Sequence, residues 1–343
     1  MNIYNLFRQY ANIGGGRTKL LILCALHVFR RRYLGIYIDP VLGCNYRCQM
    51  CYFSDEKIRK ARRGRMTEAQ IDNTAKALFS RALKLQIGCG AEPSIDLNGT
   101  MQLVKLGAKY GVPYISMTSN GVLLTYPILR ELVETGLNEL TISLHGVHRE
   151  TYERLMGPTS NYDAFLVLLE NVRKIKQQYP KFVVRINYTM NADNVDELSD
   201  FDNLFADTHI DVLQLRPIRN LGVSQYQNFS LEYISKCLET IVRPLAERCR
   251  EKHIQVLFPE QINIERFEGK KKEDIRERMV SNFVYYNITA QSYSKQNVHL
   301  DTEDYAHYSR RTHIGWQMLK AALLPQNEEQ EISLSTPLNY DIT

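Results

Sequence analysis

The feature that most constrains the fold is a regular alternation of short apolar segments with longer amphipathic ones between residues 34 and 252. Their periodicities predict strands at 34–42, 85–87, 114–118, 139–144, 182–190 and 212–216. They predict helices between the strands, at 67–84, 98–110, 126–135, 162–178, 194–207 and 230–252. Six such units in succession indicate an α/β fold of parallel strands with right-handed crossovers, which a doubly wound sheet and a barrel both satisfy.

Three cysteines stand on one short loop directly after the first predicted strand. Residues 43–52 read GCNYRCQMCY and carry Cys44, Cys48 and Cys51. Thiolates at such spacing select iron–sulfur clusters, zinc or copper(I), and iron–sulfur clusters are normally held by four cysteines. The alternatives are a partial zinc site or three structural cysteines, although no second C-x2-C or H-x3-H pair follows. The sequence therefore predicts a metal centre on this loop, with one ligand supplied from elsewhere.

The spacing Cys44-x3-Cys48-x2-Cys51 resembles the motif of the radical S-adenosylmethionine (SAM) superfamily. This resemblance implies a [4Fe–4S] cluster in which the cysteines bind three irons and SAM chelates the fourth. It implies an enzyme that cleaves SAM reductively to a 5′-deoxyadenosyl radical, which abstracts hydrogen from a substrate. A reducing partner such as a flavodoxin or ferredoxin is implied with it. It also favours a partial (β/α)6 TIM-like barrel over residues 34–253 rather than a doubly wound sheet.

A second motif follows the second predicted strand, at a strand end where barrel enzymes place active-site groups. Gly90, Ala91, Glu92 and Pro93 resemble the family's GGEP motif, with alanine in place of its second glycine. In the family the backbone there receives the SAM amino group and an acidic side chain assists. The resemblance therefore implies SAM contacts at these four residues.

Further SAM contacts are implied at five positions that match the family less closely. These are Met50, Ser119, Asn120, Ser143 and Arg154. Met50 stands where many members carry an aromatic residue, and a flexible thioether can pack on a purine in its place. Arg154 is the candidate for pairing with the SAM carboxylate, because a guanidinium matches a carboxylate bidentately. Met156 is the alternative occupant of that family position.

Polar residues on the predicted strand ends suggest contacts beyond SAM itself. His145 and His148 follow the fourth predicted strand and are candidates for proton handling or substrate contact. Asn187 and Arg216 interleave with apolar strand residues, so we expect them to contact substrate or SAM inside the barrel. Cys89 is interpreted as a small buried hydrophobe rather than a catalytic thiol.

The composition fits a large protein of a reducing compartment. Hydrophobic residues make up 44% of the 343, enough for an extensive core. The net charge of +5, from 43 Lys and Arg against 38 Asp and Glu, gives no direct indication of nucleic-acid binding, because such binding needs clustered charge. Seven cysteines, three of them on one loop, indicate the cytoplasm rather than a disulfide framework.

The N-terminal residues 1–33 are predicted to form a helical extension with a break at glycines 14–16. Residues 20–29 are apolar and lie between basic residues, but they are too few to span a bilayer. We interpret this segment as a helix packed against the barrel. The alternative is an interfacial helix, with residues 17–32 in peripheral contact with a membrane.

The C-terminal residues 254–343 are predicted to form an irregular cap, because the alternation ends with an edge strand at 254–258. A charged helix is expected at 270–278 and a short closing helix at 315–324. The core resembles peptide-modifying family members, but those carry a cysteine-rich C-terminal extension for auxiliary clusters and this tail has no cysteine. Peptide or protein modification is slightly favoured, while a small metabolite, lipid or nucleotide is also permitted. A cluster-bearing and SAM-binding regulatory protein without radical turnover is the alternative function.

Overall fold

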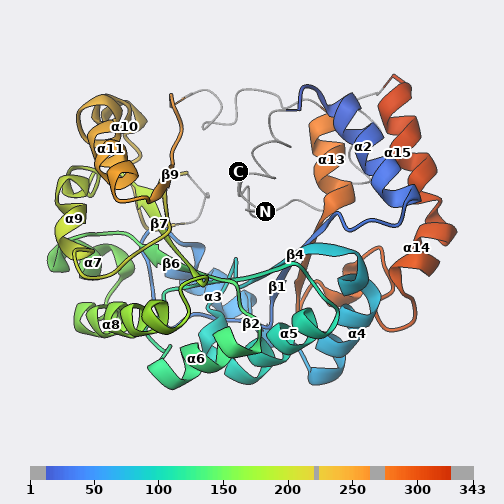
Figure 1. Cartoon of the computed structure of the whole chain (residues 1–343), viewed down its shortest axis with the longest axis horizontal. Coiled ribbons are helices and arrows are strands. Elements are labelled where there is room, and N and C mark those ends of the chain that lie inside the picture. The colour runs from blue at the N-terminus through green and yellow to red at the C-terminus, as the bar shows by residue number, and fades with distance from the viewer. Residues whose placement is uncertain (1–12, 220–223, 263–274, 326–343) are drawn as a thin grey trace.

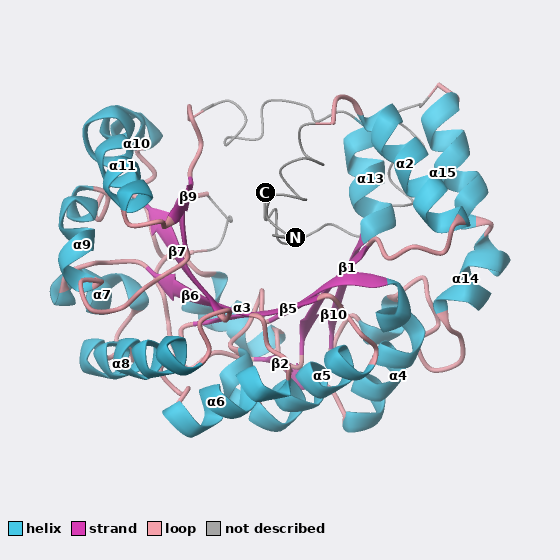
Figure 2. Cartoon of the chain, viewed as in Figure 1, coloured by secondary structure: helices cyan, strands magenta, loops and turns pink. Residues whose placement is uncertain are grey.

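The computed structural model describes residues 13–219, 224–262 and 275–325. Its centre is a parallel sheet in the order β10-β1-β4-β5-β6-β7-β8-β9. The strands are β1 Leu34–Asp39, β4 Ala82–Ile87, β5 Tyr114–Ser119, β6 Glu139–Leu144, β7 Val183–Met190, β8 Val212–Pro217, β9 Gln255–Leu257 and β10 Tyr285–Thr289. The sheet curves into an open barrel with helices on its outer side (Figures 1 and 2). The predicted α/β fold with a parallel sheet is confirmed, and its shape is consistent with a partial TIM-like barrel.

Amphipathic helices cover the convex side of the sheet between successive strands (Figure 2). They are α4 Glu68–Leu78, α5 Leu97–Lys109, α6 Tyr126–Thr135, α7 Arg149–Met156, α8 Tyr162–Gln178, α9 Phe201–Leu204, α10 Leu231–Cys237 and α11 Arg243–Glu251. Thr67 is the N-cap of α4: its hydroxyl accepts from the Gln70 N–H and the Gln70 side chain accepts from the Thr67 N–H. This capping box fixes where α4 begins.

The two faces of the sheet differ in polarity, as β7 shows. Its alternate residues Val184, Ile186 and Tyr188 are fully buried. The intervening residues, including Arg185 and Asn187, are only partly buried. Because side chains alternate between the two faces of a strand, one face packs under the helices and the other lines the concave side of the barrel. That inner face is polar and partly accessible, so it suits a ligand rather than an apolar core.

Several predicted boundaries differ from the observed ones. The predicted strand 34–42 divides at Pro40, because residues 41–42 form β2 and pair with β3 (Gly64–Arg65) in a separate antiparallel ribbon. The helix predicted to reach residue 84 ends at Leu78, and β4 begins at Ala82. The predicted helix 230–252 is interrupted by a π-helical turn at Leu238–Val242, where Pro244 lacks an N–H for the regular ladder.

Two predicted loop and helix regions also differ. Residues 149–156 form the helix α7, which was not predicted. The predicted helix 194–207 is mostly a 3-10 turn, Asp196–Asp200, followed by the single-turn α9. A short helix, α3 (Glu56–Ala61), lies in the basic stretch after the cysteine loop.

The C-terminal region is more regular than predicted. It contributes α13 Ile275–Val284, α14 Tyr305–Thr312, α15 Ile314–Leu323 and the unpredicted strand β10. β10 lies parallel to β1, from the pair Gly35 and Tyr285 to the pair Asp39 and Thr289. The predicted edge strand at 254–258 is present as β9, at the opposite edge of the sheet. Part of the charged helix predicted at 270–278 falls outside the described residues.

The N-terminal helix α2 (Gly16–Val28) packs beside α13 and α15 (Figure 1). Its side chains Leu20 and Leu23 are buried. The part of the predicted extension before residue 13 lies outside the described residues. Within the described part of the chain, no helix is both long and apolar enough to cross a bilayer.

Candidate cluster and SAM site

The three cysteines lie on a loop that follows β2 and has its own internal hydrogen bonds. The Cys51 N–H donates to the Cys48 carbonyl at 2.9 Å. The Cys51 thiol accepts weakly from the Phe53 N–H at 3.5 Å, and the Cys44 thiol accepts from the Tyr46 N–H at 3.4 Å. All three thiols are free and partly buried. These contacts fix the conformation of the loop around the thiols, and Cys48 lies near enough to Cys44 and Cys51 to respond to their charges.

Burial favours the protonated form of all three thiols when no metal is bound. Burial raises the pKa of Cys48 and Cys51, and it raises the pKa of Cys44 to about 12, to which the Glu92 charge adds. The charges of Cys44 and Cys51 further raise the pKa of Cys48. A bound metal reverses this tendency, because it binds the thiolate form.

A single metal ion and a cluster require different arrangements of their ligands. Within residues 13–219, 224–262 and 275–325, no three His, Cys, Asp or Glu side chains converge where one metal ion could be held. Each cysteine of a [4Fe–4S] cluster binds a different iron, so its thiolates need not converge on one point. Three thiols on one loop are therefore compatible with the cysteine ligands of such a cluster.

The end of α7 and the turn that follows it pack against the backbone of the cysteine loop. Gly157 has φ +93°, and a Cβ there would overlap the Arg47 carbonyl group. Gln49 binds the end of α7 twice, from its N–H to the Leu155 carbonyl and from Nε2 to the Arg154 carbonyl, both at 2.9 Å. The loop and the end of α7 are thus in direct backbone contact, which only glycine at 157 permits.

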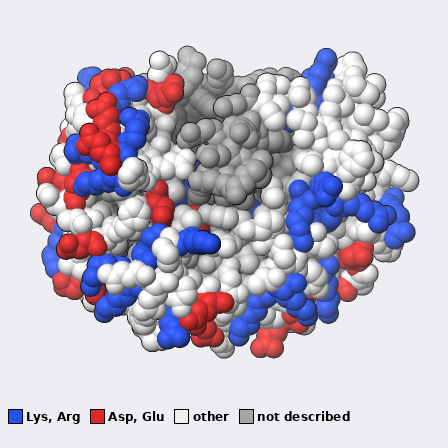
Figure 3. Space-filling model, in the orientation of Figure 1, with Lys and Arg blue, Asp and Glu red and all other residues white. Residues whose placement is uncertain are grey.

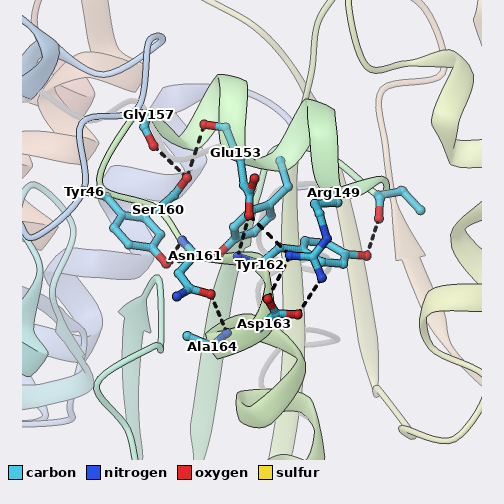
Figure 4. A network of polar contacts seen from close by, with 11 residues as sticks. Tyr46, Arg149, Glu153, Gly157, Ser160, Asn161, Tyr162, Asp163 and Ala164 are labelled. Carbon is cyan, nitrogen blue, oxygen red and sulfur yellow. Dashed lines mark hydrogen bonds and ion pairs between the residues drawn. The ribbon is translucent and has the colours of Figure 1, made fainter.

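A polar network fixes the turn between α7 and α8 on which this contact depends (Figure 4). Ser160 Oγ donates to the Gly157 carbonyl at 2.7 Å. Asn161 Oδ1 caps α8 by accepting from the Ala164 N–H at 3.0 Å, and the Asn161 N–H donates to the Tyr46 hydroxyl at 3.3 Å. Tyr46 belongs to the cysteine loop, so this network joins the loop to two helices.

The Asp39 carboxylate, at the end of β1, accepts hydrogen bonds from the backbone of the loop of residues 88–93. Asp39 Oδ1 accepts from the Cys89 N–H at 2.9 Å, and both carboxylate oxygens lie within 3.3 Å of the Gly90 nitrogen. Burial raises the pKa of Asp39 to about 6, and the backbone donors oppose that rise. The sequence analysis missed Asp39, and its position at the end of the first strand was the available signal.

Two contacts join this loop to the cysteine loop. The Glu92 N–H donates to the Gly43 carbonyl at 2.8 Å. The Tyr52 hydroxyl donates to the Gly90 carbonyl. The motif of residues 90–93 and the three cysteines therefore form one continuous structure, with Pro93 buried at its end and Ala91 at its partly buried middle.

The Glu92 carboxylate bridges the ends of β4 and β5. Its Oε1 accepts from the Ser119 hydroxyl at 2.6 Å and from the Ser94 hydroxyl at 2.5 Å. Its Oε2 accepts from the Asn120 N–H at 2.8 Å. Burial raises the pKa of Glu92, and these donors oppose that rise. Both oxygens are thus used within the protein, which gives Glu92 a positioning role that the sequence analysis did not predict.

Two of the predicted SAM contacts, Asn120 and Met50, are each held by an asparagine side chain. Asn120 Nδ2 donates to Asn45 Oδ1 at 2.8 Å. Asn191 Nδ2 lies 3.1 Å from the sulfur of Met50, a buried residue of the loop. Asn45 and Asn191 were not predicted, because neither belongs to a recognised motif.

Other predicted residues lie apart from these contacts. The Arg154 guanidinium is 44% exposed and pairs with Asp193 at 3.3 Å. Ser143 lies on the inner face of β6, level with Asn187 on β7. His148 is exposed and its Nε2 lies 3.0 Å from Asp200, whereas burial lowers the pKa of His145 to about 4.

Cationic side chains of three strands line the inner face of the barrel. Lys84, Arg185 and Arg216 alternate with apolar residues of β4, β7 and β8. Burial and the Arg185 charge lower the pKa of Lys84 to about 8, and burial lowers the pKa of Arg216 to about 10. Arg185 lies 3.8 Å from Glu139, whose carboxylate also accepts from the Tyr114 hydroxyl at 2.6 Å.

The open parallel barrel and its cysteine loop define a class of cluster-binding α/β proteins. The sequence profile of the radical SAM superfamily matches residues 38–205. The chain belongs to the radical SAM superfamily, and membership implies a [4Fe–4S] cluster and SAM as cofactors.

Curated relatives include two proteins named probable GTP 3′,8-cyclase. The one from Sulfurisphaera tokodaii is 25% identical over 215 residues, which cover 61% of this chain and 64% of the relative. The one from Thermoplasma volcanium is 28% identical over 190 residues, covering 55% of each. The chain thus spans less than two thirds of the length of these relatives.

Solved structures share the fold at low sequence identity. Streptococcus suis SuiB bound to S-adenosylmethionine has a TM-score of 0.56 at 14% identity, over 78% of this chain and 61% of SuiB. The protein anSMEcpe with bound AdoMet and a peptide has a TM-score of 0.51 at 17% identity, over 65% of this chain and 63% of anSMEcpe.

Proposed function

We propose that this protein is a radical SAM enzyme that abstracts hydrogen from a substrate held against the inner face of the barrel. The observation that carries the proposal is the joining of the cysteine loop to residues 90–93 through the Glu92 N–H and the Gly43 carbonyl. When bound, the cluster and SAM together supply reductive SAM cleavage and the hydrogen-abstracting species. A flavodoxin or ferredoxin is the proposed electron donor, and the seven free cysteines support a reducing, cytoplasmic location.

The chain's own residues have three tasks in this proposal. Cys44, Cys48 and Cys51 hold the cluster. Residues 90–93, together with Met50, Ser119, Asn120 and Ser143, form the proposed SAM site. Arg154 is retained as a candidate SAM contact only if its pairing with Asp193 opens, because that ion pair occupies its guanidinium. The Glu92 carboxylate positions Ser119 and the Asn120 backbone for this site.

The experiment is anaerobic reconstitution with iron and sulfide, reduction with dithionite in the presence of SAM, and chromatography for 5′-deoxyadenosine. We expect 5′-deoxyadenosine from the wild type and from Cys237→Ala, because Cys237 is a buried thiol on α10, outside the loop. We expect none from Cys48→Ala. The absorbance of the cluster and the iron content are measured on all three proteins.

Two outcomes contradict this proposal differently. If the wild type binds a cluster and SAM but releases no 5′-deoxyadenosine with any tested substrate, the cluster-bearing binding protein is the better reading. If the wild type forms no cluster although circular dichroism shows it folded, the assignment of the cysteine loop is wrong.

For the substrate we infer an anionic molecule, because Lys84, Arg185 and Arg216 share the inner face. Burial, and after it the repulsion from the Arg185 charge, lowers the pKa of Lys84 and Arg216. An anion placed among these cations would relieve the repulsion. A nucleotide and an acidic peptide both meet this requirement. The curated relatives named for GTP favour the nucleotide, and the resemblance of the core motifs to peptide-modifying members of the superfamily favours the peptide.

GTP is the first substrate to test, at equal concentration with an acidic peptide and with neither. We expect the anionic substrate to raise 5′-deoxyadenosine release, and Lys84→Met to reduce that gain about tenfold while the basal, substrate-free release persists. Equal release with all three additions contradicts the anionic substrate without affecting the assignment of the cluster.

A further inference from the structure

Exposed apolar side chains concentrate on one pair of helices. Among the described residues eleven large hydrophobic side chains are exposed, and six of them lie on α2, α15 or the residue that follows each helix. The most exposed are Phe29 at 74%, Val28 at 67%, Leu323 at 61% and Trp316 at 56%. Scattered single apolar residues are ordinary on a surface, but a gathering of this kind marks an interaction site.

The spacing of these residues places them on the solvent-facing side of each helix. Leu21 and Val28 are seven residues apart on α2, and Trp316 and Leu323 are seven apart on α15. Seven residues are close to two helical turns, so each pair shares one face. The opposite faces, with Leu20 and Met318, are buried.

The two helices are neighbours and run in opposite directions. The Cys24 thiol of α2 lies 3.5 Å from the Gly315 carbonyl at the start of α15. The Arg276 side chain, which packs against Gly16 at the start of α2, donates to the Leu324 carbonyl after α15. The apolar residues therefore belong to one two-helix surface, which we call the α2/α15 face.

The two segments that carry this face contain basic residues and no acidic ones. Residues 13–33 and 305–325 contain no Asp or Glu. Lys19 and Arg311 pair with Glu277 and Glu303, at 2.8 and 2.6 Å. Arg17, Arg30 and Arg31 are exposed and make no ion pair with any described residue. Figure 3 shows the region over α2 and α15 as largely neutral, with basic side chains at its border.

We propose that the α2/α15 face docks on a membrane surface that carries anionic lipid. An apolar face bordered by cations suits the boundary between headgroups and acyl chains, where apolar side chains insert and basic ones remain among the phosphates. Trp316 carries Lys320 over its ring at 5.4 Å, which pairs an interfacial aromatic residue with a cation. Neither helix is long enough to span a bilayer, so the pair lies in the plane of the interface.

The charge pattern distinguishes this occupant from a second copy of the chain. Two copies meeting through the same face would bring the cations of both together, with no acid in these segments to neutralise them. An anionic bilayer neutralises all of them. Each basic residue near such a surface contributes about a fivefold gain in partition.

The test is flotation of the purified full-length protein with vesicles of phosphatidylcholine alone or with phosphatidylglycerol at one part in three. We expect flotation with the anionic vesicles, falling at least tenfold when salt is raised from about 0.05 to 0.5 M. We expect a fall of at least tenfold for Phe29→Ser combined with Trp316→Ser, and about fivefold for each of Arg30→Gln and Arg31→Gln.

The matched control is Val167→Ser combined with Tyr233→Ser. Val167 and Tyr233 are exposed by 60% and 39% on α8 and α10, and their replacement is expected to leave flotation unchanged. Thermal unfolding verifies that each variant is folded. The proposal is overturned if the wild type does not float, or if the control variant loses as much flotation as the α2/α15 variant. It is also overturned if sedimentation shows a dimer that Phe29→Ser and Trp316→Ser abolish. None of these results depends on whether SAM is cleaved.

Discussion

At the scale of single residues, Asp39 links the first strand to the loop proposed to hold SAM. Its buried carboxylate receives backbone N–H groups of Cys89 and Gly90 rather than a cation. Burial without a paired cation raises the pKa of Asp39 to about 6, from an ordinary value of 3.8. The folded protein therefore binds this proton more tightly than the unfolded chain does.

This difference gives a pH-dependent stability with a definite sign. The contribution of Asp39 is fully present below about pH 4 and is lost as the pH rises through 6. We expect the difference in unfolding free energy between wild type and Asp39→Asn to fall by about 1–1.5 kcal/mol from pH 5 to 7.5. Urea unfolding of both proteins at four pH values measures it. A difference that stays constant with pH contradicts the raised pKa.

At the scale of elements, the contact between the cysteine loop and the end of α7 depends on one glycine. Gly157→Ala adds a methyl group where the Arg47 carbonyl lies, in a backbone conformation that costs about 1–3 kcal/mol for other residues. We expect this variant to lose at least about 2 kcal/mol of stability and to bind less iron after reconstitution. Urea unfolding and iron analysis measure both.

Gly111→Ala is the control for this variant. Gly111 has φ +63°, but the nearest atom to an added Cβ is 3.6 Å away, so only the conformational cost of about 1–2 kcal/mol applies. Its iron content should equal that of the wild type. Equal iron loss in both variants would show that the contact with Arg47 does not position the loop.

Some helices and strands could be predicted accurately from the sequence, and others could not. The predicted ranges 114–118, 126–135 and 139–144 match β5, α6 and β6 to within one residue, because their apolar periods are unambiguous. β10 was not predicted, because its five residues, YYNIT, become a strand by pairing with β1, far away in sequence. The local sequence pattern of a segment does not indicate which distant strand it will pair with.

The same distinction holds within the candidate site. Motif spacing drew attention to Cys44, Cys48, Cys51 and Glu92, and the structure joins their loops. Asp39 and Asn45 were missed because they bind the backbone or side chains of loops remote in sequence. A motif reveals residues with a shared chemical task, whereas the residues that hold a motif in place become visible only once the chain is folded.

At the scale of the whole molecule, the two edges of the sheet differ in burial. Ile288 on β10 is 1% exposed and packs in the main core, whereas Val256 on β9 is only partly buried. We expect Ile288→Ala to cost about 2–5 kcal/mol of unfolding free energy and Val256→Ala less than half as much. Urea unfolding of the two variants measures the difference, and equal costs would mean that β10 contributes no more than β9 does.

The pairing of β1 with β10 has a consequence for synthesis on the ribosome. Gly35 and Tyr285 are partners separated by 250 positions in the chain. At about 5–20 residues per second, the ribosome needs roughly 10–50 s to make that interval. Throughout this time one edge of β1 has no strand to pair with, and such an edge invites association with other chains. The nascent protein therefore carries its greatest risk of aggregation until translation reaches the last strand of the sheet.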